Sequence, residues 1–401
     1  MELLAPAGNL EKLKVALIYG ADAVYVGGRE FSLRAFGDNF GNDELIAAVE
    51  FTHALGKKIY VAVNIFAHNA DIAPLENYIA FLDRIGIDAL LISDLGVFSI
   101  AKKIVRRAEL HVSTQANVTN FRAVNAWRDL GASRIVLARE LSFDEIKFIA
   151  ENSAVELEMF IHGAMCLSYS GRCWLSHYLT GRDGNFGKCT HSCRWKYALV
   201  EEKRPNEFFS VGEDERGTYV MNSKDLCLLP CLDKVLTSGV TSLKIEGRMK
   251  SVHYVASTVK VYREAIDEYF AAPEHFRIRA EWIEELEKTA HRPFTTGFFV
   301  EDRNGTMTGD SSKSDRTSEF LGIVREYDRE SGEALVEQRG KIEVGRMIEI
   351  LLPRGASFVQ RLNSMTDTDG NSIAAAPHAQ QLVKIRLERA VEPWALLRTG
   401  D

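Results

Sequence analysis

The chain has 401 residues, of which 46% are hydrophobic and 26% charged, and its formal net charge is −7. These values describe a globular chain with room for one large and one small domain, and they exclude a disordered or low-complexity protein. The net charge weakly disfavours a protein coated with nucleic acid, but it permits a local basic patch. No apolar run approaches the roughly 18 residues that span a bilayer, and the N-terminus lacks a signal-peptide pattern. We therefore expect a cytoplasmic protein with no membrane segment.

Short runs rich in Val and Ile alternate with amphipathic helical patterns from the first residue onward. We predict strands over 2–7, 22–27, 58–66, 89–93, 110–115, 134–138, 155–162 and 241–246. We predict helices over 9–19, 43–55, 74–85, 96–106, 121–130, 143–151, 229–238 and 252–270. This alternation predicts an α/β protein with a (β/α)8, TIM-like barrel over residues 1–272. An open doubly wound sheet shares the local pattern, but no glycine-rich dinucleotide fingerprint follows the first strand.

The rhythm changes at two places in the chain. After the seventh strand, residues 163–217 form a cysteine-bearing insertion before the next helical pattern. After residue 272 the sequence predicts one more helix (276–290), an exit turn (291–297) and a polar linker (301–317), so residues 273–318 connect two domains. Short alternating runs at 320–324, 333–337, 347–352 and 381–387 then predict a small, all-β, barrel-like domain over 319–401.

Reactive groups of a (β/α)8 barrel lie where strands end and the following loops begin. The polar residues at those positions are Asn64, Asp94, Gln115, Asn117, Arg139, Glu140, His162, Lys244, Glu246 and Arg248. Strand alternation places Lys244, Glu246 and Arg248 on one side of the last strand. Such a set must be paired to be tolerated in a buried place, so it is either structural or an anion pocket.

Two further features of the sequence have more than one interpretation. His162 is expected to share a strand face with Glu158 and Phe160, and it is either a packed, hydrogen-bonded side chain or a catalytic base. The run 222–225 precedes a predicted helix, and its simplest interpretation is an N-cap with solvated charges.

Four closely spaced thiols dominate the insertion. Cys166, Cys173, Cys189 and Cys193 follow the pattern C-x6-C-x15-C-x3-C. A reducing cytosol disfavours structural disulfides, which leaves metal binding or catalysis. The loose spacing favours an iron–sulfur cluster. The alternatives are a tetrahedral zinc site, or cysteines that bind neither. Cys227 and Cys231 have helical i, i+4 spacing, so we expect them on one face in the core.

The insertion also mixes basic and aromatic residues. Between 171 and 197 they are Arg172, Arg182, Lys188, Arg194, Lys196, Trp174, Tyr178, Phe186, Trp195 and Tyr197. Such a mixture suits contacts to phosphates together with stacking on bases. An ordinary solvated face with aromatic residues packed on the barrel rim explains it equally well.

The segment Glu158-x-Phe160-x2-Gly163-Ala164-Met165-Cys166-x4-Gly171-x-Cys173-x-Leu175-Ser176 resembles the signature of the peptidase U32 family, the collagenase-like proteases. The resemblance extends to five further motifs along the chain, at 4–8, 20–25, 113–116, 244–248 and 292–297. No Gly-x-Ser-x-Gly elbow and no His-Glu-x-x-His helix is present, so protease machinery is not visible in the sequence.

The resemblance implies a more specific function. Members of this family include oxygen-independent hydroxylation proteins, and those with an appended β domain resemble the branch that 5-hydroxylates the wobble uridine of tRNA with a prephenate-like donor. In these relatives cysteines hold a 4Fe-4S cluster, and the matching positions here are Cys166, Cys173, Cys189 and Cys193. The resemblance thus implies tRNA and a prephenate-like molecule as partners. Zinc is the alternative metal.

We expect the substrate and proton chemistry at the strand ends. Arg139, Lys244 and Arg248 would hold carboxylates, and Gln115 would also contact substrate. His162 or Glu246 would move protons. The alternatives are a U32-type peptidase, or a non-catalytic, cluster-bearing subunit that works with a paralogous family member.

Overall fold

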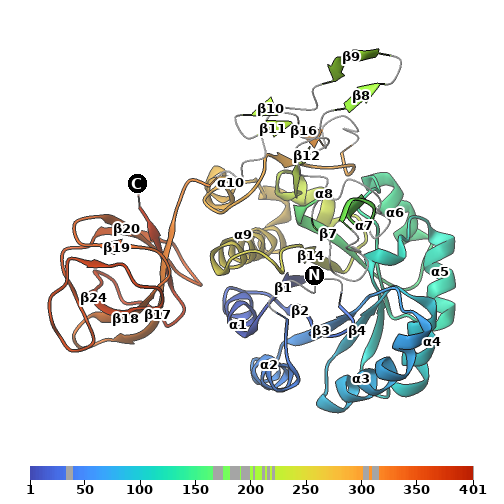
Figure 1. The fold of residues 1–401 in the computed structure, drawn as a ribbon, viewed down its shortest axis with the longest axis horizontal. Helices are drawn as coiled ribbons and strands as arrows, with labels where there is room; N and C mark the ends of the chain where they lie inside the picture. Colours follow the sequence, from blue (N-terminus) through green and yellow to red (C-terminus); the bar gives the residue numbers. More distant parts are fainter. Residues whose placement is uncertain are drawn as a thin grey trace.

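The structure is a computed structural model, and it describes residues 1–32, 39–165, 222–300 and 316–400. It also describes the short segments 175–180, 190, 199–201, 204–209, 213–214, 217–218 and 307–308. Figure 1 shows two bodies, a barrel surrounded by helices and a β-rich body coloured orange to red. No helix among these described residues is long and apolar enough to cross a membrane.

Eight parallel strands form a closed barrel, which confirms the predicted fold (Figure 1). They are β1 (Glu2–Pro6), β2 (Ala23–Gly27), β3 (Lys58–Val63), β4 (Ala89–Ile92), β5 (Glu109–Val112), β6 (Arg134–Val136), β7 (Glu156–Ala164) and β14 (Ser242–Ile245). Neighbours pair in chain order, and the pairing of β14 with both β7 and β1 closes the ring. The strands are mostly apolar and almost wholly buried, because they are covered by helices outside and by side chains inside.

Helices cover the outside of the barrel. They are α1 (Leu10–Ile18), α2 (Asn42–Ala54), α3 (Ile72–Ile85), α4 (Leu95–Ile104), α5 (Phe121–Leu130), α6 (Phe143–Glu151), α8 (Leu232–Leu236) and α9 (Val252–Ala271). Local signals set their ends. The side chain of Asn120 accepts a hydrogen bond from the backbone N–H of Ala123 at the start of α5, and Gly131, with φ of 111°, terminates that helix.

The segment 222–227 is not a helix cap, so the N-cap interpretation is wrong. Residues Asn222–Ser223 form β12, and Asp225–Cys227 form β13, which runs antiparallel to the last residues of β7. β7 continues beyond the end of β14, so its free backbone groups need a partner there, and β13 supplies it. The motif at 292–297 is more than an exit turn, because β15 (Phe294–Thr295) pairs with β13.

Further short elements belong to the region between the two bodies and to the insertion. They are α7 (Leu175–Thr180), β8 (Leu199–Glu201), β9 (Arg204–Phe209), β10 (Glu213–Asp214), β11 (Gly217–Thr218), β16 (Met307–Thr308) and α10 (Ala280–Glu287). β16 pairs with β12, which connects the predicted linker region to the segment before β13. The helix expected over 276–290 is shorter, since α10 covers Ala280–Glu287, and a separate 3-10 turn at Pro273–His275 precedes it.

The C-terminal body is an antiparallel β domain with its own apolar core. Its seven-stranded sheet contains β17 (Phe320–Asp328), β18 (Glu333–Gln338), β20 (Met347–Leu351), β21 (Phe358–Arg361), β22 (Met365–Thr366), β24 (Leu382–Arg386) and β25 (Leu396–Thr399). A small pair, β19 (Ile342–Glu343) and β23 (Ala375–Ala376), completes it. The all-β character follows from alternating buried and exposed residues, as in β18.

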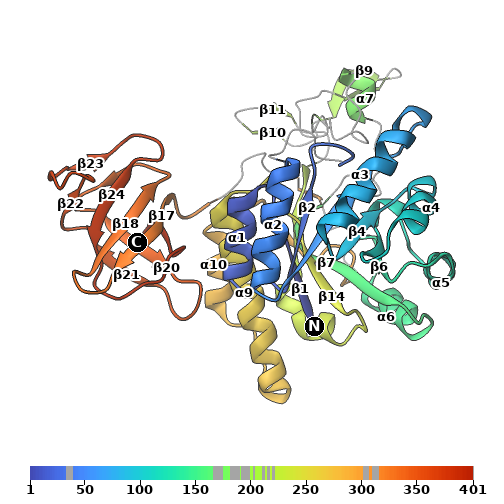
Figure 2. The ribbon, with the colours of Figure 1, turned by 90° about the horizontal axis from the view of Figure 1, so that it is seen from below.

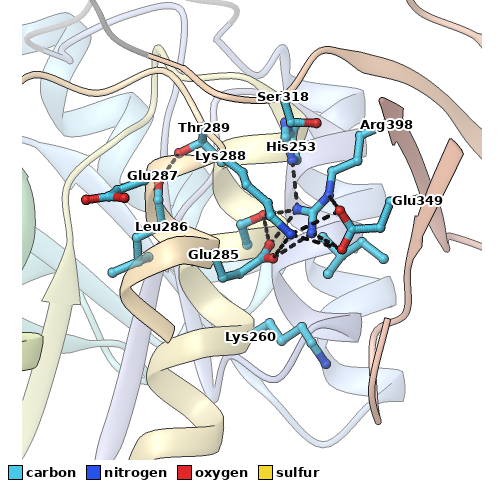
Figure 3. Close-up of polar contacts among 12 residues, drawn as sticks. His253, Lys260, Glu285, Leu286, Glu287, Lys288, Thr289, Ser318, Glu349 and Arg398 are labelled. Carbon is cyan, nitrogen blue, oxygen red and sulfur yellow. Dashed lines mark hydrogen bonds and ion pairs between the residues drawn. The ribbon is translucent and has the colours of Figure 1, made fainter. Parts of the chain in front are cut away.

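This domain packs against the barrel beside α1, α9 and α10 (Figure 2). The Tyr19 hydroxyl of α1 donates to the backbone oxygens of Leu351 and Trp394, both at 3.0 Å. Arg398 of β25 lies between Glu285 of α10 and Glu349 of β20 (Figure 3). Hydrogen bonds and ion pairs therefore hold the two domains in a defined relative position.

Candidate functional site at the barrel mouth

A charged layer fills the interior of the barrel below its mouth. The Nζ of Lys244 donates to Glu158 Oε1 at 2.7 Å, and Ser242 Oγ donates to Glu158 Oε2 at 3.2 Å. Arg134 also contacts Glu158, at 3.4 Å, and bonds Glu2 and Glu156. Burial alone would raise the pKa of Glu158, but the attraction of Lys244 and Arg134 outweighs it and holds the pKa below its usual value. Lys244 is therefore neutralised by a protein carboxylate.

Arg139 and Glu246 meet at the rim above this layer. Arg139 Nη1 donates to the backbone oxygen of Ala164 at 2.8 Å, and Nη2 lies 3.4 Å from Glu246 Oε2. The guanidinium also stacks on Phe160, with its carbon 3.8 Å from the ring centre. The Tyr25 hydroxyl lies 3.4 Å from the same Glu246 oxygen. One guanidinium thus joins the end of β7 to a partly exposed carboxylate after β14.

Arg248 lies at the same end of the barrel, between the ends of β14 and β2. Its Nη2 donates to Ser32 Oγ at 2.9 Å, and the residue is 6% exposed. A Cβ atom on Gly27 would lie 1.9 Å from Arg248 Nη1 and 2.5 Å from Ser32 Oγ. Only glycine fits at this position, because any side chain would occupy the space of the guanidinium.

Gln115 follows β5 in a 3-10 turn (Thr114–Ala116) on the same end of the barrel. The Thr114 hydroxyl donates to the backbone oxygen of Leu137 at 3.1 Å, and the N–H of Ala138 donates to Val118 at 3.1 Å. These two bonds attach the turn that carries Gln115 to the residues after β6, directly before Arg139 in the chain. The structure therefore brings Gln115, Arg139, Glu246 and Arg248 to one rim, as strand-end positions predict.

His162 lies elsewhere, and the expectation that it shares a face with Glu158 and Phe160 is wrong. The register of β7 against β14 shifts between Lys244 and Ile245, which pair with Phe160 and His162. This bulge adds a residue to β7 and reverses the alternation.

The His162 ring consequently packs among Tyr254 and Tyr262 of α9 and Phe294. Burial lowers the pKa of His162 to about 3, so the ring is neutral at physiological pH.

Asp225 is a buried acid that the sequence interpretation missed. Its carboxylate lies 3.6 Å from Lys250 Nζ and accepts the N–H of Arg292 at 3.2 Å. The residue is 3% exposed and stands opposite Ala164 in the β7–β13 ladder. The sequence shows the motif at 292–297 but contains no local pattern to indicate that this motif packs against residue 225.

The four cysteines of the insertion, Cys166, Cys173, Cys189 and Cys193, lie outside the described residues. The described chain reaches Met165, one residue after the Ala164 oxygen that Arg139 binds. Cys227 and Cys231 are buried, as expected, although Cys227 lies in β13 and the two do not share a helix face. Burial raises the pKa of Cys227 to about 11 and that of Cys231 to about 12, so both are neutral thiols.

Comparison with known proteins identifies the family of this chain. The family model of peptidase family U32 matches residues 8–309, and the model of the U32 C-terminal domain matches residues 316–398. The chain belongs to peptidase family U32. Its β domain is accordingly the U32 C-terminal domain.

Three similar proteins illustrate the relationship. The Bacillus subtilis protein named tRNA hydroxylation protein P1 is 43% identical over 401 residues, which cover 100% of this chain and 94% of that protein. The Escherichia coli tRNA hydroxylation protein P is 37% identical, over 94% of this chain and 91% of its own length. A crystal structure of the C-terminal domain of a Geobacillus thermoleovorans U32 peptidase is 36% identical, covering 21% of this chain and 93% of that one, with a TM-score of 0.20.

Proposed function

We propose that this U32 protein hydroxylates tRNA, at carbon 5 of the wobble uridine, without molecular oxygen. The observation that carries the proposal is the similarity, over the full length of the chain, to a relative named tRNA hydroxylation protein P1. The geometry supports an enzyme, because four polar or charged side chains meet at the barrel end where (β/α)8 enzymes have their active sites.

The basic side chains of the rim suit a small carboxylate-bearing donor of the hydroxyl group, such as a prephenate-like molecule. Guanidinium groups bind carboxylates with two parallel hydrogen bonds. Arg139 and Arg248 are the rim residues for this role, since both lie at the strand ends and both are held by fixed contacts. Lys244 is left out of this role in our proposal, because its ammonium lies below the rim and already binds Glu158 at 2.7 Å.

Cys166, Cys173, Cys189 and Cys193 would hold a 4Fe-4S cluster, which supplies electron transfer when bound. This assignment rests on their spacing and on the resemblance of the segment to hydroxylation proteins. Cys166 directly follows Met165 in the chain, and Ala164 before it is fixed by Arg139. Cys227 and Cys231 are excluded from this role in our proposal, since a raised thiol pKa disfavours the thiolate that binds metal.

Glu246 is the better of the two candidates for moving protons. Its carboxylate is 16% exposed at the rim and lies 3.4 Å from both Arg139 and the Tyr25 hydroxyl. His162 is 2% exposed behind β7 and faces α9, away from the rim. A general base must reach the proton that it removes, so we assign this role to Glu246.

The test is mass spectrometry of tRNA nucleosides from a strain that lacks this gene and any redundant hydroxylation route. Restoring the wild-type gene should restore 5-hydroxylation of the wobble uridine, and restoring Glu246→Gln should not. Arg329→Met serves as the control, because Arg329 forms an exposed pair with Glu392 far from the rim. Unchanged hydroxylation in the deletion strain would refute the proposal.

A further inference from the structure

The corner between β5 and β6 carries three buried polar atoms that lack hydrogen-bond partners. They are Oε1 of Gln115, Oδ1 of Asn117 and Nε of Arg139, and each is buried from solvent. Native proteins satisfy nearly all their buried polar groups, so such atoms require a reason. Such atoms also occur elsewhere in the described chain, for example at the Thr52 and Thr258 hydroxyls on α2 and α9 and at Gln338 Oε1 with Arg339 Nε.

The three atoms belong to one fixed corner. The loop after β5 is attached to the end of β6 by two hydrogen bonds, from Thr114 Oγ1 to Leu137 and from the N–H of Ala138 to Val118. Gln115 and Asn117 lie between these two attachments, and Arg139 follows Ala138 directly. Asn117 has φ of 58°, a left-handed backbone conformation that ends the 3-10 turn.

The chemistry of the three atoms defines what fits them. Two are amide oxygens, which accept hydrogen bonds, and one is a guanidinium N–H, which donates. In the orientation that the structure gives the two amides, a carboxylate or phosphate, which offers only acceptors, suits Arg139 but not the two amide oxygens. A ligand that satisfies all three atoms in this orientation carries hydrogen-bond donors next to an acceptor.

We infer that Gln115, Asn117 and Arg139 form the site that binds the uracil base of the RNA on its Watson–Crick edge. Uracil presents an N3–H donor between two carbonyl acceptors, so its N3–H would donate to an amide oxygen and a carbonyl would accept from the Arg139 Nε–H. The second amide oxygen accepts from the ribose 2′-hydroxyl, a group that RNA-binding proteins commonly contact. These contacts leave the C5–C6 side of the base free to face the rest of the mouth. The inference rests on the proposed function and assigns the residues that bind the uracil base of the RNA substrate.

The test is equilibrium binding of the full-length protein to two RNA anticodon stem–loops. One carries uridine at the wobble position, and the other carries 3-methyluridine, which lacks the N3–H donor. The wild type should bind the uridine stem–loop about tenfold more tightly or better, since a buried acceptor left without its donor is costly. Gln115→Met, which removes the acceptor and keeps the length, should bring the two affinities within about threefold of each other.

Two further variants sharpen the comparison. Asn117→Gly removes the second acceptor and keeps the left-handed backbone, and it should weaken binding of the uridine stem–loop. Asn125→Ala is the matched control, because Asn125 also has a buried, unpartnered carbonyl oxygen but lies on α5. It should preserve the discrimination of the wild type.

The outcomes separate this inference from the function on which it rests. Equal affinity of the wild type for both stem–loops overturns the base site and leaves tRNA hydroxylation standing. Full discrimination in both Gln115→Met and Asn117→Gly also overturns it. If the wild type binds neither stem–loop, the tRNA substrate of the proposed function fails as well.

Discussion

Arg398 and Glu285 face each other across the domain boundary and form two hydrogen bonds of 2.6 Å (Figure 3). Arg398 is 0% exposed and also bonds Glu349 at 2.7 and 2.9 Å. Burial would raise the pKa of Glu285, but Arg398 outweighs it and holds that pKa below its usual value. One guanidinium thus bonds two carboxylates from the two sides of the boundary, and Lys288 Nζ adds bonds of 3.0 Å to both oxygens of Glu349.

Replacing Arg398 with Met should destabilise the protein by about 3–5 kcal/mol, because Glu285 and Glu349 then lack the buried cation between them. The measurement is the free energy of unfolding in urea at pH 7. Arg329→Met is the control, since the Arg329–Glu392 pair is 74% and 70% exposed, and it should cost about 0–1 kcal/mol. Equal effects of the two substitutions would contradict the role of Arg398.

Glu158→Gln should also be costly, since it leaves the Lys244 ammonium buried without a carboxylate. We expect a loss of about 3–5 kcal/mol at pH 7. The folded-state pKa of Glu158 is lowered, so its contribution is present above the usual value of 4.5 and is lost as pH falls through the folded pKa. The wild type and the variant should therefore converge in stability as pH is reduced below 4.5.

The control for Glu158 is Asp267→Asn, which removes an exposed i, i+4 partner of Arg263. It should cost less than about 0.5 kcal/mol at every pH. The measurement is urea unfolding from pH 7 down to pH 2, which covers the range below 4.5 where the contribution of Glu158 is lost. A difference between wild type and Glu158→Gln that stays constant below pH 4.5 would rule out the assigned charge pairing.

His162 should not titrate between pH 8 and pH 5, because burial lowers its pKa to about 3. Nitrogen-detected NMR of the imidazole measures this directly. A lowered folded-state pKa means that stability is full above the usual 6.5 and falls as pH drops from 6.5 toward 3. His162→Phe should lose less stability than the wild type over that interval. Titration of His162 near pH 6.5 would restore it as a candidate base.

Gly27→Ala should displace Arg248, since the new Cβ would lie 1.9 Å from its Nη1 atom. We expect affinity for a prephenate-like dicarboxylate to fall by about tenfold or more, the cost of a lost charge-assisted hydrogen bond. Isothermal titration calorimetry provides the measurement. In the control, Gly41→Ala, the nearest atoms lie 3.5 Å from the new Cβ, so affinity should be unchanged. Unchanged affinity in Gly27→Ala would show that Arg248 does not bind the donor.

Alanine at Cys166, Cys173, Cys189 or Cys193 should each abolish iron binding, whereas alanine at Cys227 or Cys231 should preserve it. The physical reason is that ligands must be thiolates, and burial raises the pKa of Cys227 to about 11 and of Cys231 to about 12. Iron, sulfide and zinc analysis after anaerobic purification provides the readout. A colourless protein with stoichiometric zinc would replace the cluster with a zinc site.

The sequence by itself determined the barrel and most of its helices. Runs such as 59–63 are apolar and buried because both faces of a parallel strand are covered, and capping residues such as Asn120 and Gly131 fix helix ends locally. It also placed Gln115, Arg139 and Arg248 at one rim, because the carboxyl ends of the strands in a closed parallel barrel meet at one end.

Only the tertiary structure decided the features that depend on pairing between distant segments. The face of His162 depends on a bulge against β14, about 80 residues further along the chain. Asp225 became a buried strand residue because β7 has free backbone groups beyond β14. Arg398 finds Glu285 across the domain boundary. Each of these three features depends on contacts between segments far apart in the sequence. The local periodicity of the sequence does not specify such contacts.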